Sequence, residues 1–207
     1  MTSIESITLE VADLTAAEHF YAALGLGTRV RLRASEEPTD GFRGFVLSIT
    51  VSQPGNVKAL FAAALDAGAT TLKPVTKSFW GYGGVVRAPD GTIWKIATSA
   101  KKDTGPATLE FDDLVLLLGS TDVSATKRFY VSQGLEVGKS FGSKYVEFAT
   151  PSGTVKFGLY GRRALAKDAG VPAEGSGSHR LAINGSTGPF SDPDGFGWEA
   201  AALTPAS

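Results

Sequence analysis

The stretch "APDGTIWKIA", residues 88–97, returns later in the chain as "DPDGFGWEAA", residues 192–201. Proline, aspartate, glycine and tryptophan recur in register, but Lys95 stands where the second stretch has Glu199. A Pro-Asp-Gly turn followed by an aromatic segment is typical of a hairpin that leads into a strand. The pattern therefore predicts the same turn and strand twice, with a cation exchanged for an anion at one position.

A second pair of segments repeats in the same order. "VADLTAAEHFYAALGLG" (residues 11–27) matches "STDVSATKRFYVSQGLEV" (residues 120–137). Each contains an aspartate that can cap a helix, Asp13 or Asp122, followed by an apolar stripe and a glycine stop. Two repeated segments in one order indicate a tandem duplication.

The polar segment at residues 100–110 contains Gly and Pro and suits a linker between the copies. We predict two domains, 1–100 and 108–203, in each of which one module is shortened. The alternating residues 6–11 predict a half-buried strand, and residues 54–68 predict a helix with proline in its first turn. The second copy shows successive strands and no obvious second long helix before residue 192.

Two glycine-rich stretches, Gly81–Gly84 and Glu174–His179, are interpreted as flexible loops at the mouth of a cleft. The first lacks the lysine, the spacing and the following helix of a phosphate-binding loop. The chain also lacks a Gly-x-Ser-x-Gly elbow, and it has only two histidines to serve any triad. Neither stretch therefore indicates a known catalytic motif.

Composition excludes several classes of function. The chain has no cysteine, which rules out disulfides, thiolate nucleophiles and Cys-ligated metals. A net charge of −1 without a basic cluster argues against a nucleic-acid or membrane partner. No apolar run approaches the roughly 18 residues of a membrane span, and no signal peptide is visible. We expect a cytoplasmic protein.

The order of strand, capped helix and closing Pro-Asp-Gly hairpin, met twice, resembles the glyoxalase / bleomycin-resistance / extradiol-dioxygenase (vicinal oxygen chelate) superfamily. "FWGYGGVVRAPDGTIWKIA" and "KFGLYGRRALAKDAGV" resemble segments of its small bacterial members. The resemblance covers nearly the whole chain. It implies an α+β fold of tandem glyoxalase-like domains built from βαβββ modules, whose curved mixed sheets enclose a central cleft with helices outside.

In metal-dependent members of that superfamily, the ligands come from the first and last strands of a module. Carried over by position, the resemblance places Ser6 and Val115 on first strands, where a histidine would be expected. It places Lys95 and Glu199 on the last strands. A charged lysine cannot coordinate a metal, so the resemblance leaves at most His179 and Glu199 as ligands, with Glu147 or a substrate atom as a third donor.

Structural roles compete with these functional ones. His179 suits a loop boundary at a strand edge, and Glu199 suits an ion pair with an arginine such as Arg180. Lys95 suits an ion pair with Glu10 across the cleft floor. His19 is expected to face solvent from the first helix. Two tryptophans, Trp94 and Trp198, are expected to pack under helices.

Three functions remain open. The first is a metal-independent protein that binds a small planar or amphiphilic molecule for sequestration or transport and needs no cofactor. Its cleft would have the aromatic walls Phe79, Trp80 and Tyr82 and the polar residues Lys95, Glu10 and Arg33. The second is a glyoxalase-type lyase, isomerase or dioxygenase with a divalent metal at His179 and Glu199, where Glu199 moves a proton.

The third function is a protein-interaction module, which a cleft filled by the protein's own side chains would favour. The apolar Val115 and Leu117 hint at such filling. A monomer is expected if the tandem copies complete each other's clefts, and a homodimer is expected if the shortened modules leave strand edges to pair.

Overall fold

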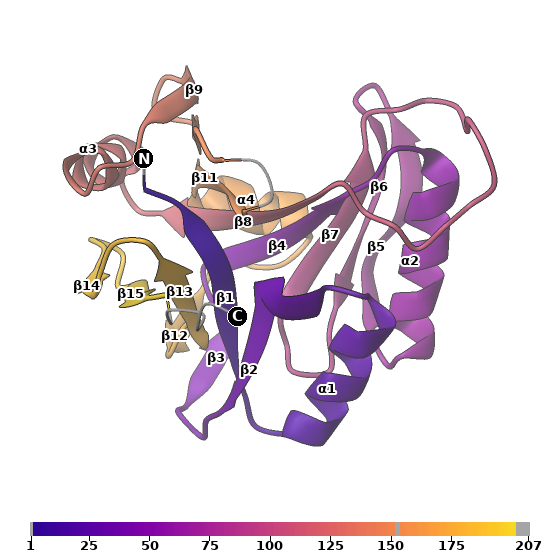
Figure 1. Cartoon of the computed structure of the whole chain (residues 1–207), viewed down its shortest axis with the longest axis horizontal. Helices are drawn as coiled ribbons and strands as arrows, with labels where there is room; N and C mark the ends of the chain where they lie inside the picture. Colours follow the sequence, from indigo (N-terminus) through magenta and orange to yellow (C-terminus); the bar gives the residue numbers. More distant parts are fainter. Residues whose placement is uncertain (1, 152–153, 202–207) are drawn as a thin grey trace, which may run out of the picture.

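The computed structural model describes residues 2–151 and 154–201, and its strands form two large mixed sheets and one short ribbon (Figure 1). The five-stranded sheet has the order β14-β15-β13-β1-β2, with the bounds Phe190–Ser191, Gly197–Ala200, Leu181–Gly185, Ile4–Val11 and Val30–Ala34. The eight-stranded sheet has the order β5-β6-β7-β4-β8-β11-β10-β9, with the bounds Thr70–Ser78, Gly81–Arg87, Ile93–Thr98, Phe45–Thr50, Asp113–Ser120, Lys156–Gly161, Tyr145–Phe148 and Val137–Phe141. The ribbon pairs β3 (Thr39–Gly41) with β12 (Gly175–Gly177). The predicted α+β class is confirmed.

Each large sheet has an antiparallel pair near its centre, β1 with β13 and β4 with β8. Both pairs join the two halves of the sequence, because β1 and β4 precede the repeat boundary and β8 and β13 follow it. A closing strand then runs parallel to a central one, β7 beside β4 and β15 beside β13. In this register Lys95 lies opposite Ser48, and Glu199 lies opposite Asn184.

Four α-helices accompany the described strands: α1 (Leu14–Ala23), α2 (Pro54–Asp66), α3 (Val123–Ser132) and α4 (Arg162–Ala169), together with one 3₁₀ turn, η1 (Gly27–Arg29). The predicted caps are confirmed, since the Asp13 carboxylate accepts from the Ala16 N–H at 3.0 Å and Asp122 caps α3 in the same way. No helix within the described residues has the length and apolar character that a membrane crossing requires.

The two faces of the eight-stranded sheet are covered by different helices. On one face, alternate residues such as Leu47 and Leu116 join the main core with α1, α2 and α3. On the opposite face, Val46 and Leu117 form a second cluster with Leu165 and two alanines of α4. The sequence pattern did not predict α4, and this helix lies on the inner face, where the resemblance placed an open cleft.

The repeated tryptophans explain why the two Pro-Asp-Gly segments are so alike. Trp94 is fully buried and Trp198 is 2 % exposed. The Trp94 indole N–H donates to the Tyr21 hydroxyl of α1 at 3.4 Å, and the Trp198 N–H donates to the Tyr130 hydroxyl of α3 at 3.2 Å. Each tyrosine donates in turn to a turn aspartate. Each Pro-Asp-Gly segment therefore links a helix to a closing strand through these hydrogen bonds. Both tryptophans pack under helices, as predicted.

The prediction of a loop was wrong for residues 81–84 and for residues 175–177, which belong to paired strands, whereas Glu174, Ser178 and His179 lie outside strands. Residues 81–84 begin β6, and residues 175–177 form β12. At Gly81 a Cβ atom would lie 2.0 Å from the Thr98 carbonyl oxygen, and at Gly175 it would lie 2.3 Å from that of Phe42. These glycines permit close backbone approach within the sheets.

Candidate functional site

Lys95 lies on β7, and its side chain meets the inserted helix α4. Its Nζ atom is 2.6 Å from the Asp168 Oδ2 atom, and both side chains are partly exposed. Ser48 and Val115 stand beside Lys95 in the same row of the sheet. The predicted pair between Lys95 and Glu10 is therefore wrong, because the nearest carboxylate is supplied by a helix that the sequence did not reveal.

A second lysine reaches the same end of α4. Lys73 of β5 donates from Nζ to the Lys167 carbonyl oxygen at 2.9 Å and to the Asp168 carbonyl oxygen at 2.6 Å. The last carbonyls of a helix carry a partial negative charge and lack intrahelical donors. Lys73 and Lys95 thus place two ammonium groups where α4 presents its carbonyls and one carboxylate.

Beside this contact, a cleft of about 920 Å³ remains open on the inner face of the eight-stranded sheet. We call it the lysine cleft. Its lining includes Lys73, Trp80, Tyr82, Lys95, Tyr160 and Asp168. Helix α4 therefore fills part of the inner face and leaves a hollow lined by two lysines, by three aromatic side chains and by the aspartates Asp112, Asp113 and Asp168. Asp113 is paired with Lys156, which lies outside this lining.

Tyr160 gives this cleft a hydrogen-bond donor. Burial raises the pKa of its phenol, and the negative charges of Asp168 and Glu147 raise that pKa further. The hydroxyl therefore keeps its proton at neutral pH. It can donate to an oxygen atom in the cleft but does not serve as a base there.

The structure separates the three predicted aromatic residues. Phe79 and Trp80 form the two-residue turn between β5 and β6, and they are 79 % and 81 % exposed. Their rings pack edge to face at 5.1 Å. Trp80 and Tyr82 line the lysine cleft, whereas Phe79 is not among its lining residues and instead lies 5.3 Å below the Lys101 ammonium.

Glu10 and Arg33 belong to the five-stranded sheet and not to the lysine cleft. Arg33 Nη2 lies 2.7 Å from Glu10 Oε1 and 2.9 Å from Glu199 Oε1. The hydrogen bonds that Arg33 donates to Glu199 and Glu10 raise the pKa of its guanidinium. Glu199 is thus paired with an arginine as predicted, but the partner is Arg33 and not Arg180.

His179 is held by two backbone carbonyls. Its Nδ1 atom lies 2.6 Å from the Arg43 carbonyl oxygen, and its Nε2 atom lies 3.1 Å from that of Asp194. The ring also stacks on Phe196 at 3.9 Å between centroids. Both ring nitrogens thus point at backbone carbonyl oxygens, which lie where a metal bound to either nitrogen would have to sit. The exposed His19 faces solvent from α1, as predicted.

The donors that the metal-dependent alternative needs do not come together. Glu199 is engaged by Arg33, and Glu147 lies on β10 of the other large sheet, where it accepts from the Tyr145 hydroxyl at 3.2 Å. Over residues 2–151 and 154–201, no three His, Cys, Asp or Glu side chains cluster as metal ligands would. These residues therefore do not fit the metal site that the resemblance implies.

Three residues of the cleft were not identified from the sequence: Lys73, Tyr160 and Asp168. Lys73 acts from a bulged part of β5, where the register with β6 shifts on both sides of it. Asp168 acts from the end of α4, followed by Gly170 in the left-handed conformation. That glycine is a helix-stop signal, and it was the available clue to α4.

Solved structures of similar fold place these sites in context. The chain aligns with a mutant of glyoxalase I from Zea mays at 14% identity, over 96% of this chain and 91% of that one, with a TM-score of 0.62. A further structure of glyoxalase I from Zea mays aligns at 14% identity over 90% of this chain and 75% of that one, with a TM-score of 0.58. No family model and no curated protein matches the sequence. The predicted resemblance is thus confirmed for the fold.

Proposed function

We propose that this protein, which has the fold of glyoxalase I, binds a small anionic molecule with an aromatic or apolar body in the lysine cleft, without a metal. Sequestration or transport of that molecule needs affinity alone. The observation that carries the proposal is the convergence of Lys73 and Lys95 on the end of α4 inside a cleft of about 920 Å³. A hollow of this size accepts a drug-sized ligand.

The charge of the ligand follows from the contacts of the two lysines. Their partners in the protein are carbonyl oxygens and the half-exposed Asp168 carboxylate. Asp168 thus stands where the anionic group of a ligand would bind, and an exposed ion pair of this kind contributes only about 0–1 kcal/mol. A ligand carboxylate, which also gains a hydrogen bond from the Tyr160 hydroxyl, can replace Asp168 at Lys95 at small cost.

The body of the ligand is expected to be flat and apolar. Trp80 and Tyr82 border the cleft from the β5–β6 hairpin, and Tyr160 borders it from β11. Gly83, where a Cβ atom would point toward Ala97 of the same lining, leaves this part of the wall free of a side chain. Aromatic rings can stack on such a surface, while the cations at the end of α4 hold the charged end.

A titration with 2-naphthoate and its neutral analogue 2-naphthamide tests this proposal. Trp80 is the exposed tryptophan of the three, so its fluorescence reports on the cleft, and Trp80→Phe removes that signal as a control. We expect saturable binding of the acid that is about tenfold tighter than that of the amide, because one charged hydrogen bond is worth about 1.5–3 kcal/mol. Lys73→Gln should remove most of this preference. Equal binding of acid and amide, or no saturation, would overturn the proposal.

The interaction-module alternative draws on one observation, the packing of Leu165, Ala166 and Ala169 of α4 into the inner face of the sheet. This packing fills the end of the face near Val46 and Leu117. Since the lysine cleft stays open beside it, the small-molecule proposal is favoured. A monomer or homodimer and a cytoplasmic location remain predictions.

A further inference from the structure

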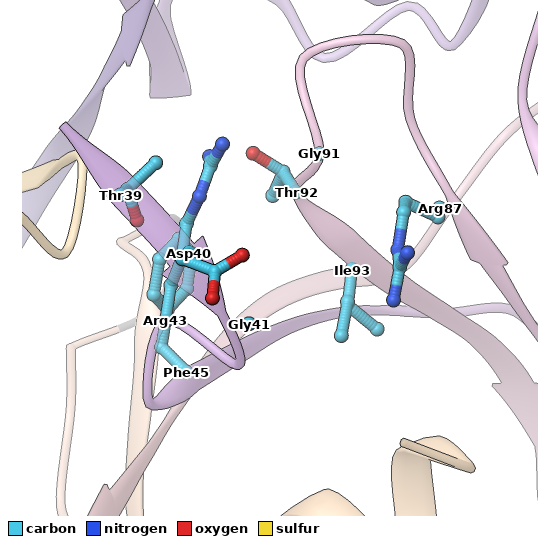
Figure 2. A pocket seen from close by; sticks show the side chains of 9 residues that line it. All are labelled: Thr39, Asp40, Gly41, Arg43, Phe45, Arg87, Gly91, Thr92 and Ile93. Atoms are coloured by element: carbon cyan, nitrogen blue, oxygen red, sulfur yellow. The ribbon is translucent and has the colours of Figure 1, made fainter. Parts of the chain in front are cut away.

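A smaller hollow lies away from the lysine cleft, between the β3–β4 segment and the β6–β7 hairpin. Its volume is about 180 Å³. Figure 2 shows Asp40 and Arg43 on one side of it and Arg87 and Ile93 on the other. Thr39 and Thr92 complete its polar wall. We call it the arginine hollow.

Arg43 is the residue of this hollow that lacks a full set of partners. Its Nη2 atom donates to the Asp90 carbonyl oxygen at 2.6 Å, but its Nη1 atom is buried without a hydrogen-bond partner among the described residues. The Thr39 hydroxyl, in the wall of the same hollow, is also buried and without a partner there. Buried donors without acceptors are rare in folded proteins.

The charge around Arg43 is also unbalanced. Burial lowers the pKa of its guanidinium. The negative charge of Asp90 raises this pKa, and the positive charges of Arg180 and Arg87 lower it. None of these three arginines is paired with a carboxylate at ion-pair distance within the described part of the chain. The Asp90 carboxylate itself accepts from the Tyr21 hydroxyl and from Thr92.

Glycine at position 91 makes room for this arginine. It has φ +88°, and a Cβ atom there would lie 2.8 Å from Arg43 Nη2. In the other Pro-Asp-Gly turn, Gly195 lies beside the His179 ring, and His179 contacts the Asp194 carbonyl as Arg43 contacts that of Asp90. The same turn is thus contacted by an arginine in the first repeat and by a histidine in the second, and the hollow lies beside the arginine.

From these contacts we infer that the arginine hollow binds a small oxyanion, with Arg43 and Arg87, which border it from opposite sides, as its cationic ligands. Guanidinium groups present paired N–H donors that match phosphate and carboxylate oxygens. A volume of about 180 Å³ admits an anion of the size of phosphate or a short carboxylate. The Asp40 carboxylate at the wall weakens binding of a fully ionised anion by repulsion.

Inorganic phosphate and acetate, titrated at low ionic strength by calorimetry, test this inference and separate the two oxyanion classes. We expect one anion per chain from at least one of them. Arg87→Gln is the informative variant, because Arg87 is exposed and its replacement leaves the fold intact. It should weaken binding about tenfold. Asp40→Asn should tighten binding about threefold.

Two controls keep the outcome independent of the lysine cleft. Arg128→Gln removes an exposed arginine of α3 and should leave anion affinity unchanged. Lys95→Gln should also leave it unchanged, although the same change weakens 2-naphthoate. Absence of saturable binding by either anion, loss of binding in Lys95→Gln, or unchanged affinity in both Arg87→Gln and Asp40→Asn would overturn the inference.

Discussion

The closing strands β7 and β15 hold the same place in the two large sheets, and they carry opposite charges there. On β7, Lys95 binds Asp168 of the inserted helix α4. On β15, Glu199 binds Arg33, which also binds Glu10. In both sheets the residue at the position that the resemblance assigns to a metal ligand therefore forms an ion pair. It is a lysine where the neighbouring partner is an aspartate, and a glutamate where the neighbouring partner is an arginine.

The two regions differ in what covers them. The inner face of the eight-stranded sheet holds α4 and the lysine cleft. On the five-stranded sheet, Ser6 and Thr8 donate instead to the Asn184 side-chain oxygen beside Glu199, and all three residues are buried. The smaller sheet thus satisfies its own polar groups. The larger sheet keeps two ammonium groups beside an open hollow, which makes it the place where we propose binding.

The buried tryptophans should show the largest effects on stability. Trp94→Ala and Trp198→Ala should each lower the free energy of unfolding by about 3–5 kcal/mol, because each leaves a cavity under a helix. Urea denaturation followed by circular dichroism measures this. The exposed Trp80→Ala, which should change stability by less than about 0.5 kcal/mol, is the control. A small loss for one buried tryptophan alone would show that the two repeats are not equivalent in packing.

Replacing the two tyrosines that contact these tryptophans should destabilise the protein to different extents in the two repeats. Tyr130 donates to Asp192 at 2.7 Å and is fully buried, whereas Tyr21 donates to Asp90 at 3.0 Å and is 6 % exposed. Tyr130→Phe and Tyr21→Phe should both cost about 1–3 kcal/mol, the former more, because the acceptor that loses its donor is buried in the case of Asp192 and only partly buried in the case of Asp90. Denaturation of both variants side by side tests the order. A reversed order would contradict the stronger anchoring of α3.

Asp194 should make stability depend on pH in the second repeat. Burial acts to raise its pKa, but hydrogen bonds from the Thr121 N–H and from the hydroxyls of Ser120, Thr121 and Thr126 outweigh burial and lower that pKa. The carboxylate thus stabilises the fold above its unfolded pKa of about 3.9, and this contribution is lost as the pH falls through the folded pKa.

The matching variant is Asp194→Asn. It should lower the free energy of unfolding by about 1–2 kcal/mol at pH 7, since the amide can keep some of these hydrogen bonds but carries no charge. The difference from the unaltered protein should shrink below about pH 4, where the carboxyl of the unfolded chain is protonated first and the native carboxylate follows at its lower pKa. Thermal unfolding between pH 3 and pH 7 measures it. A difference independent of pH would assign the effect to packing.

The smallest change in stability is expected in the lysine cleft. Asp168→Asn breaks a partly exposed ion pair and should alter the free energy of unfolding by less than about 1 kcal/mol. It also frees Lys95, so 2-naphthoate should bind about threefold to tenfold tighter. Fluorescence titration measures the affinity. Weaker binding in this variant would mean that Asp168 helps to bind the ligand and does not compete with it.

Local signals in the sequence predicted much of the fold. The aspartate caps of α1 and α3 and the burial of both tryptophans depend on residues within a few positions of one another. Helix α4 was missed because eight residues make a marginal helix that packing against Val46 and Leu117 stabilises. Packing of that kind does not show in a local pattern.

The candidate site was less predictable for the same reason. Lys95 and Asp168, and likewise Arg33 and Glu199, are brought together by strand order and by α4, so their pairing requires the tertiary structure. Phe79 was misplaced because β5 and β6 pair up to the residues that flank the turn, Ser78 and Gly81. The turn then directs Phe79 away from the cleft. Trp80, Tyr82 and Lys95 do line the lysine cleft, and their role in binding a ligand stays a prediction.

The most direct test compares Lys95 with Glu199, which hold matching positions on the two closing strands. It is a calorimetric titration of 2-naphthoate into the unaltered protein and into the variants Lys95→Gln and Glu199→Gln. We predict that Lys95→Gln weakens binding about tenfold, since it removes one charged hydrogen bond, and that Glu199→Gln leaves the affinity unchanged. Binding that is lost in Glu199→Gln and kept in Lys95→Gln would contradict the assignment and would place the ligand on the five-stranded sheet.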